Sequence, residues 1–414
     1  MNRWKYRCPD CGAEYDIAPG RYLCDKCSGA NAAGKPLEGV LECVWEGDWR
    51  GGPESVPLPV EREYFPPLPV GDTPLWAPER LRAELGVPGL WLKDDTCNPS
   101  GSYKDRASWL VAAFARKHGI REIALASTGN AASSMACVGA AAGLAITVFL
   151  PKAAPAAKRI QVLQYGAALR EVDGTYDVAF DESLAYSEAT GVLSRNTAYN
   201  PLTIEGKKTA AFEIARALGR AESDASDSTG THGTPDSPGT PGAALTAPAV
   251  WRAPDHVFVP TGDGVIIAGV IRGFEDLIKL GRIRAMPRIW AAQAEGSSAI
   301  ARAFETGVFE SRPSDTIADS ISVDVPRNGS YALKKLKAYG GGAVVSSDED
   351  ILRAQAYLSR MSGLFAEPSS ACAFAGFLKS RSAIGPDESV VVMLTGSGLK
   401  DIKSAAKAVG TAVY

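Results

Sequence analysis

Lys104 is placed by its sequence neighbours to act as a nucleophilic amine. It follows the small-residue turn Asn98-Pro-Ser-Gly-Ser-Tyr and opens a predicted helix that runs through Trp109 and Phe114. Burial and nearby positive charge, including the positive end of a helix, both favour the neutral amine. A neutral amine is the state that forms an imine with an aldehyde. By itself, however, the pattern is also typical of an ordinary surface lysine at the start of a helix.

Four segments dense in Gly, Ser, Thr and Asn are candidates for binding polar groups. They are residues 98–105, 127–130, 260–264 and 395–398. At least the last three follow apolar runs that are predicted strands, so we expect them to gather at the carboxyl edge of a parallel sheet, where such folds bind ligands. Gly262-Asp263-Gly264 precedes a predicted helix and has the form of a phosphate-binding turn, although a lone Gly-x-Gly is weak evidence.

Four of the eight cysteines have the spacing of a metal site. Cys8 and Cys11 form one Cys-x2-Cys pair, and Cys24 and Cys27 form a second. Each pair resembles a knuckle of a zinc ribbon, in which four thiolates surround one ion and leave no position for water or substrate. We therefore predict a structural zinc site, with loss of the metal or disulfide formation as the alternative. The other cysteines are predicted to be buried small side chains: Cys43, Cys97, Cys137 and Cys372.

Composition and charge argue against several classes of function. A net charge of −3 and a pI of about 5.8 provide no basic surface for nucleic acid or an anionic membrane. No stretch reaches the roughly 18 uninterrupted apolar residues of a membrane span. The chain has three histidines, none beside an obvious nucleophile, so a Ser-His-Asp or Cys-His site is not indicated. We predict a cytoplasmic protein that acts on a small molecule.

Strands and helices alternate along most of the chain. The predicted strands are 123–126, 146–150, 169–172, 257–260 and 289–292. The predicted helices are 131–142, one that ends near residue 166, 178–188, 211–218 and 266–280. This alternation is typical of parallel sheets with crossover helices, and its return after residue 200 predicts a second α/β domain.

Residues 221–250 differ from the rest of the chain in composition. Ser, Thr, Gly, Pro and Asp dominate this segment, which has almost nothing apolar to bury. We predict a disordered insertion on the surface, because a long excursion between a helix and a strand costs little loop-closure entropy. His232 lies inside it and is therefore not expected to be catalytic.

The polar segments, taken in order, resemble the motifs of fold-type-II pyridoxal-phosphate enzymes and of the threonine synthase family in particular. The resemblance covers nearly the whole chain. The matching motifs are Gly71-Asp-Thr-Pro-Leu75, Asn98-Pro-Ser-Gly-Ser-Tyr-Lys-Asp-Arg106, Ser127-Thr-Gly-Asn130, Asn200-Pro201, Glu205-Gly206, Lys208-Thr209, Gly262-Asp-Gly264 and Leu394-Thr-Gly396.

This resemblance implies a role for each matching residue. Lys104 would hold pyridoxal phosphate as a Schiff base, Asn130 would bond the ring hydroxyl, and Thr395 would face the ring nitrogen. Ser127 and Thr128 would bind the substrate carboxylate. The phosphate of the cofactor would lie on the turn of Gly262, Asp263 and Gly264.

The patterns together predict an α/β protein with the two-domain fold-type-II architecture, parallel-rich sheets and an N-terminal zinc-ribbon-like segment. Residues 1–45 would form that segment. Residues 46–105 and 198–414 would form the large cofactor-binding domain, which carries the insertion, and residues 106–197 the small domain. The resemblance also implies a homodimer.

The implied activity is that of a lyase that converts O-phosphohomoserine and water to threonine and phosphate. Ala131 follows Asn130, where serine and threonine dehydratases usually carry histidine, which favours the synthase branch. The family's substrate-phosphate arginine is replaced by Thr203, with Lys207 as the nearest alternative cation. Asp263 stands where the family often has asparagine, so backbone donors would have to bind most of the cofactor phosphate.

Two alternatives remain open from the sequence. The absent arginine is compatible with β-replacement or β-elimination on a serine derivative, as in cysteate synthase or a dehydratase. A non-catalytic protein that kept the fold is the other alternative, and it would bind no cofactor.

Overall fold

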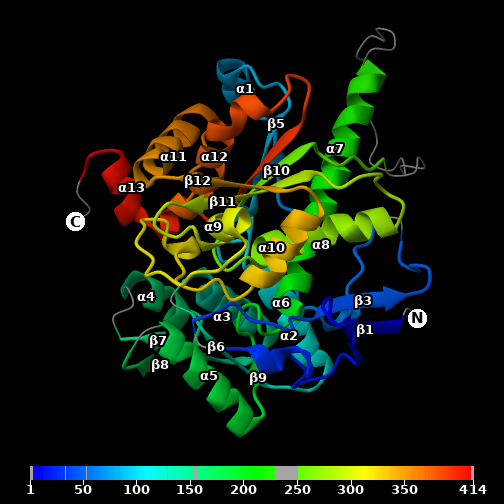
Figure 1. Cartoon of the computed structure of the whole chain (residues 1–414), viewed down its shortest axis with the longest axis vertical. Helices are drawn as coiled ribbons and strands as arrows, with labels where there is room; N and C mark the ends of the chain where they lie inside the picture. Colours follow the sequence, from blue (N-terminus) through cyan, green and yellow to red (C-terminus); the bar gives the residue numbers. More distant parts are fainter. Residues whose placement is uncertain are drawn as a thin grey trace.

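Three β-sheets organise the chain (Figure 1). The structure is a computed structural model and describes residues 3–32, 34–52, 54–127, 129–152, 156–174, 176–228 and 250–411. The N-terminal sheet is antiparallel, in the order β2 (Glu14–Tyr15), β1 (Arg3–Arg7), β3 (Glu42–Glu46). The six-stranded sheet has the order β12 (Gly342–Ser346), β11 (Arg288–Ala294), β10 (His256–Pro260), β13 (Val390–Leu394), β5 (Leu90–Asp94), β4 (Leu75–Trp76). The four-stranded sheet has the order β8 (Ala168–Val172), β7 (Ala145–Pro151), β6 (Glu122–Ala126), β9 (Leu193–Ser194).

The two larger sheets are parallel except for the short edge strand β4, which runs against β5. The helices that connect and cover them are α1 (Glu79–Leu85), α2 (Asp105–Lys117), α3 (Asn130–Ala142), α4 (Ala156–Gln164), α5 (Tyr176–Thr190), α6 (Leu202–Glu205), α7 (Thr209–Ser228), α8 (Val265–Lys279), α9 (Ala299–Thr306), α10 (Gly329–Ala338), α11 (Asp348–Ser362), α12 (Pro368–Ser380) and α13 (Ile402–Ala408). Among the described residues, none of these helices combines the length and the apolar composition that a membrane crossing requires.

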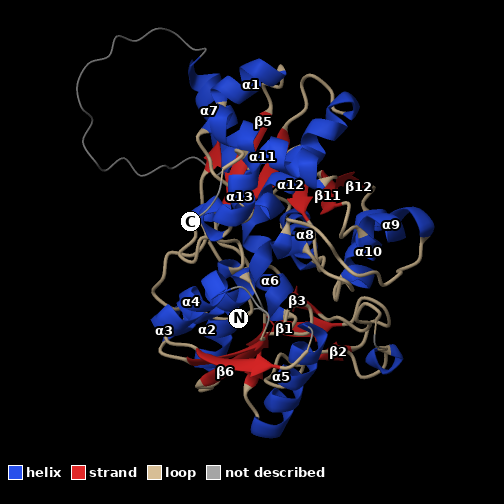
Figure 2. Ribbon diagram, turned by 90° about the vertical axis from the view of Figure 1, so that its left-hand side faces the viewer, coloured by secondary structure: helices blue, strands red, loops and turns tan. Residues whose placement is uncertain are grey.

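The six-stranded sheet is buried on both faces, as parallel sheets generally are. Alternate residues of its strands enter two different cores, because successive side chains of a strand point to opposite faces. Val257 and Val259 pack with α7 and α8, whereas Phe258 between them packs with α11 and α12. Figure 2 shows the resulting arrangement of strands between helices.

The four-stranded sheet repeats this layering at smaller scale. Ile123 and Leu125 of β6 pack into a core with α2 and α3. Ala124 and Ala126, on the other face, pack with Phe180 of α5. In Figure 2, α2, α3 and α4 accordingly lie on one side of β6 and α5 on the other.

The predicted strands and helices are present, and the strands agree to within a residue or two at each end. Helix α7 is longer than predicted. It continues to Ser228, past position 221 where the sequence predicts the insertion to begin. The rest of the predicted insertion, including His232, lies outside the described residues.

The N-terminal sheet packs on α8 of the large sheet. Arg272 donates to the carbonyl of Cys43 at 3.0 Å, and Lys279 donates to the carbonyl of Trp45 at 2.6 Å. Both carbonyls belong to β3. The cysteine-rich segment is therefore attached to α8, and the N-terminal end of α8 adjoins the polar turn at residues 262–264.

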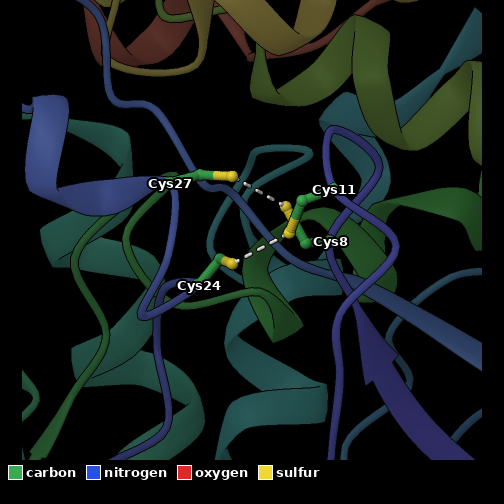
Figure 3. A group of neighbouring side chains, drawn as sticks. All are labelled: Cys8, Cys11, Cys24 and Cys27. Carbon is green, nitrogen blue, oxygen red and sulfur yellow. Dashed lines mark hydrogen bonds between the residues drawn. The ribbon is translucent and has the colours of Figure 1, made fainter.

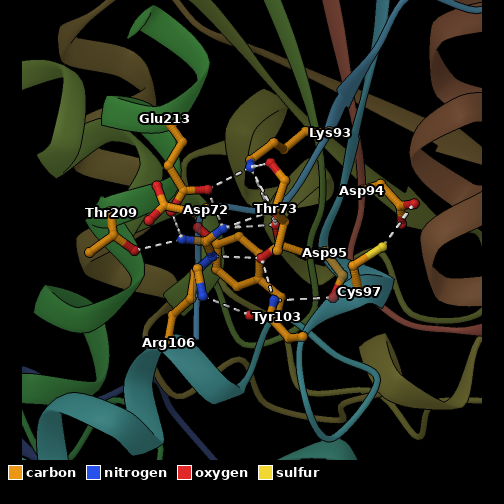
Figure 4. Close-up of polar contacts among 12 residues, drawn as sticks. Asp72, Thr73, Lys93, Asp94, Asp95, Cys97, Tyr103, Arg106, Thr209 and Glu213 are labelled. Carbon is orange, nitrogen blue, oxygen red and sulfur yellow. Dashed lines mark hydrogen bonds and ion pairs between the residues drawn. The ribbon is translucent and has the colours of Figure 1, made fainter. Parts of the chain in front are cut away.

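A buried group of charges holds the first turn of α2 (Figure 4). Arg106 bonds both carboxylate oxygens of Asp95 at 2.6 and 2.9 Å, and both of Glu213 at 2.5 and 2.7 Å. Lys93 donates to Glu213 and to the carbonyl of Thr73, each at 2.5 Å. The group joins the end of β5, helix α7 and the start of α2, so it determines where residue 104 lies.

Replacing Arg106 with methionine should cost about 3 to 5 kcal/mol of unfolding free energy, because Asp95 and Glu213 would remain buried without their partner. Arg353→Met is the matched control, since Arg353 pairs with Glu349 and Asp350 on the exposed face of α11. It should cost less than about 1 kcal/mol. Urea unfolding of both variants measures the difference, and equal costs would contradict a structural role for the buried group.

Candidate active site

Six of the predicted site residues line one cavity of about 240 Å³: Lys104, Ser127, Asn130, Gly262, Asp263 and Gly264. They come from three loops, which follow β5, β6 and β10. The carboxyl ends of these parallel strands therefore converge, as ligand sites of open α/β sheets do. A larger hollow of about 960 Å³, beside the N-terminal sheet and α7, is lined by none of the predicted site residues that the structure describes.

Lys104 lies in this cavity and not on the outer surface. It is the residue that immediately precedes α2, and its backbone is already helical. Burial lowers the pKa of its amine, and Arg195 lowers it further, whereas the carboxylates of Asp263 and Glu367 oppose the shift. The cavity therefore favours the neutral amine that imine formation requires.

Asn130 is the first residue of α3 and points its amide at a carboxylate. Its Nδ2 lies 3.0 Å from each carboxylate oxygen of Glu367 and 3.1 Å from Oγ of Ser320. Ser127 begins the same loop, and its Oγ accepts the N–H groups of Gly129 and Ala132 at 3.2 Å each. Thr128 lies outside the described residues.

The turn at residues 262–264 is shaped by close packing. Gly264 has a φ of +84° and is the N-cap of α8, so a side chain there would be strained. A Cβ on Gly262 would lie 2.8 Å from the backbone of Ile321. The glycines therefore leave the N–H groups and the positive end of a 15-residue helix directed at the cavity.

Asp263 directs its carboxylate to a neighbouring turn. Its Oδ1 accepts the N–H of Arg327 at 3.2 Å, and its carbonyl accepts the N–H of Asn328 at 2.9 Å. Burial raises the pKa of this carboxyl, and the Arg327 N–H and the charge of Lys104 oppose the shift. The contact with Arg327 is the kind of orientation that lessens repulsion between an aspartate and a bound phosphate.

Thr395 follows β13, and a backbone hydrogen bond joins it to the residue before Lys104. Its carbonyl accepts the N–H of Tyr103 at 2.8 Å, one residue before Lys104. Ser370 of α12 fixes the turn, because its Oγ accepts the N–H groups of Thr395 and Gly396 at 2.9 and 2.8 Å. Thr395 is buried and is not among the residues that line the 240 Å³ cavity.

Lys207 is also absent from the lining of that cavity. Its side chain is fully buried, and its Nζ donates to the carbonyl of Thr203 at 2.9 Å. Burial lowers the pKa of this amine well below its ordinary value, and the charges of Arg195 and Lys104 lower it further.

Two residues that sequence reasoning missed complete the site. The carboxylate of Glu367 accepts hydrogen bonds from Asn130 and Ser320. It also lies so close to Gly396 that a Cβ on that glycine would be 2.3 Å from a carboxylate oxygen. Ser370 holds the turn at Thr395. The signal in the sequence was Glu367-Pro-Ser-Ser before an apolar helix, since proline in the first turn marks a helix start.

The pattern of the family described as "Pyridoxal-phosphate dependent enzyme" matches residues 67–237 and 238–396. The chain belongs to this family. It is 32% identical to the threonine synthase of Methanosarcina acetivorans over 95% of this chain and 92% of that protein. It is also 32% identical to the threonine synthase of Methanocaldococcus jannaschii, over 97% and 94%.

A solved structure of the processed form of threonine deaminase isoform 2 from Solanum lycopersicum has the same fold, with a TM-score of 0.64 at 22% identity over 84% of this chain and 91% of that one. These similarities confirm the predicted family, the fold class and a pyridoxal-phosphate-dependent lyase of the threonine synthase type. The matched span begins at residue 67, so the cysteine-rich segment lies outside it.

The burial of Lys104 predicts a pH-dependent stability in the cofactor-free protein. An unfolded lysine has a pKa of about 10.4, and the folded value is lower, so the charged amine costs stability below the folded pKa. That cost disappears as the pH rises toward the unfolded value. Lys104→Met should therefore be more stable than the parent at pH 7, by a margin that shrinks toward pH 10.

Urea unfolding between pH 7 and pH 10 measures this margin. Lys403→Met, at an exposed position of α13, is the control. A margin for Lys104→Met that stays constant over this range would contradict a depressed pKa for the amine.

Proposed function

We propose that this protein converts O-phosphohomoserine and water to threonine and phosphate, with pyridoxal phosphate held by Lys104. The observation that carries the proposal is the convergence of Lys104, Asn130 and the turn at residues 262–264 on one cavity. The curated relatives are named threonine synthases, which supports the same reaction.

The residues present fit this cofactor. An amine whose pKa is lowered by burial suits its aldehyde, an asparagine amide suits its ring hydroxyl, and a glycine turn at a helix N-terminus suits its phosphate. Gly262 and Gly264 would bind that phosphate through backbone N–H groups, with Asp263 contributing its backbone. The hydroxyl of Thr395 would face the ring nitrogen.

Bound pyridoxal phosphate supplies an electron sink for negative charge that develops at the α-carbon of an amino acid. Lys104 would hold the cofactor, and its amine would also accept the α-proton of the substrate, a role that requires the neutral state toward which burial shifts it. Ser127 and Thr128 would bind the substrate carboxylate and so direct the α-proton toward that amine.

A second candidate is β-replacement or β-elimination on a serine derivative. Thr203, at the family's arginine position, is fully buried and donates its hydroxyl to the carbonyl of Asn200 at 2.7 Å. It therefore supplies no charge to a substrate phosphate, which is the observation that favours this alternative.

The holoenzyme should release inorganic phosphate from O-phosphohomoserine and form threonine in equal amount. Lys104→Ala should abolish this reaction because it removes both the cofactor anchor and the proton acceptor, whereas Lys403→Ala should retain it. A colorimetric phosphate assay with amino-acid analysis measures both products.

A parallel panel of phosphoserine, serine and acetylserine with sulfite or a thiol tests the second candidate. Turnover of that panel without phosphate release from O-phosphohomoserine would replace the proposed reaction with β-chemistry. A protein that neither turns over nor binds the cofactor would fit the non-catalytic alternative.

We also propose that Cys8, Cys11, Cys24 and Cys27 bind one structural zinc ion. Their sulfur atoms all lie within 4.8 Å of one another, from two turns of the N-terminal segment (Figure 3). Four thiolates complete a tetrahedral shell, so the ion would stabilise the segment without taking part in the reaction. The domain boundaries at 45/46, 105/106 and 197/198, the homodimer and the cytoplasmic location likewise stay predictions.

Purified protein should contain about one zinc ion per chain, as four-thiolate sites bind a single ion. Cys11→Ser should lose most of the metal. Cys97→Ser is the control, because Cys97 stands outside the group and is exposed, which contradicts the sequence prediction that it is buried. Elemental analysis by mass spectrometry measures the content. Equal zinc content in the two variants would contradict the four-cysteine site.

A further inference from the structure

Arg195 is a fully buried arginine that has no carboxylate partner among the described residues. Its Nη1 donates to Oγ1 of Thr197 at 2.9 Å, whereas its Nε and Nη2 are buried and find no hydrogen-bond partner among the residues that the structure describes. Burial lowers the pKa of this guanidinium to about 10, so it stays charged at neutral pH. A buried, unpaired charge is costly, and folded proteins keep one where a ligand compensates it.

The other deeply buried arginines of the described chain are paired. Arg106 bonds Asp95 and Glu213, and Arg272 lies against Glu275 at 2.5 Å and Asp276 at 3.6 Å. Both therefore serve the fold. Asp105 is the carboxylate that acts electrostatically on the pKa of Arg195. Its oxygens already accept the N–H and the hydroxyl of Ser100, at 2.7 and 2.5 Å.

Arg195 lies beside the active-site cavity, at the edge where the small sheet faces it. Its N–H donates to the carbonyl of Ala124 at 2.8 Å, which continues the parallel pairing of β9 with β6. The next residue, Asn196, accepts the N–H of Ala126 at 2.8 Å. Ala126 and Thr197 both line the cavity, whereas Arg195 does not, and its guanidinium contacts the lining through the hydrogen bond to Thr197.

We propose that Arg195, together with the hydroxyl of Thr197, forms the binding site for the phosphate group of the substrate. This inference rests on the proposed function and specifies how the site recognises a phosphorylated amino acid without an arginine at position 203. A guanidinium with free N–H groups is the side chain best suited to phosphate, because it offers several donors and a permanent charge.

Two other pairings are less suitable: Lys207 as the cation that binds the substrate phosphate, and the cofactor phosphate as the ligand of Arg195. Neither Lys207 nor Arg195 is itself a lining residue of the cavity, but the Lys207 amine already donates to the carbonyl of Thr203, whereas Arg195 is bonded to the lining residue Thr197 and keeps two nitrogens without a partner among the described residues. The glycine turn proposed for the cofactor phosphate follows β10 of the large sheet, whereas Arg195 follows β9 of the small sheet, on the side of Ser127. Arg195 therefore belongs to the substrate side of the cavity.

The test measures binding of inorganic phosphate to the holoenzyme by calorimetry, with the cofactor already bound so that its own phosphate site is filled. Arg195→Gln should weaken phosphate binding roughly 10- to 100-fold, the usual effect of removing charge-assisted hydrogen bonds. Arg195→Lys should weaken it less, because the charge remains. Arg159→Gln is the matched control, since Arg159 of α4 is paired with Glu171 on the surface.

Affinity for pyridoxal phosphate should be unchanged in all three variants, and KM for O-phosphohomoserine should rise in proportion to the phosphate dissociation constant. The phosphate titration does not depend on turnover, so it still tests Arg195 if O-phosphohomoserine is not a substrate. Three results would overturn the inference: no phosphate binding by the parent holoenzyme, equal phosphate affinity in the parent and Arg195→Gln, or an equal loss of cofactor affinity. If Arg195→Gln does not fold, Arg195→Lys replaces it in the comparison. Weaker phosphate binding with unchanged cofactor affinity would support the inference, and equal phosphate affinity would overturn it.

Discussion

The site depends on the buried ion group that holds the first turn of α2. Arg106 can be buried only because Asp95 and Glu213 surround it, and each carboxylate comes from a different part of the large-sheet half of the chain. Since Arg106 lies two residues after Lys104, this anchoring also positions the reactive amine. Burying these charges costs free energy, but their mutual hydrogen bonds hold the first turn of α2 in one position.

Buried cations in this protein fall into two groups with different consequences. Arg106, Arg272 and Lys208 have carboxylate partners, so their burial is compensated within the fold. Lys104, Lys207 and Arg195 have no such ion pair among the described residues, and each has a lowered pKa for which burial is the main cause. The two amines are thereby shifted toward their neutral form, whereas the Arg195 guanidinium stays charged at neutral pH and supplies positive potential beside the cavity.

The layered fold explains why loops distant in sequence meet in this environment. Each polar loop follows a parallel strand that is largely buried on both faces, so the exposed polar atoms begin where the sheet ends. Both parallel sheets direct this edge toward the same cavity, which receives Lys104 and the residue 262–264 turn from one and Asn130 from the other.

The sequence by itself determined the strands, most of the helices, the cysteine pairs and the family, because these depend on local periodicity and on short motifs. It also predicted Lys104, Asn130 and Gly264 as site residues, because their residue types carry recognisable chemistry at fixed spacing, and the structure places all three in one cavity. Tertiary structure alone decided that Glu367 meets Asn130, that Lys207 bonds Thr203, and that Arg195 has no carboxylate partner in the part of the chain that the structure describes. Those facts depend on which groups lie nearby after folding, and a buried charge takes its role from partners that are far away in the chain.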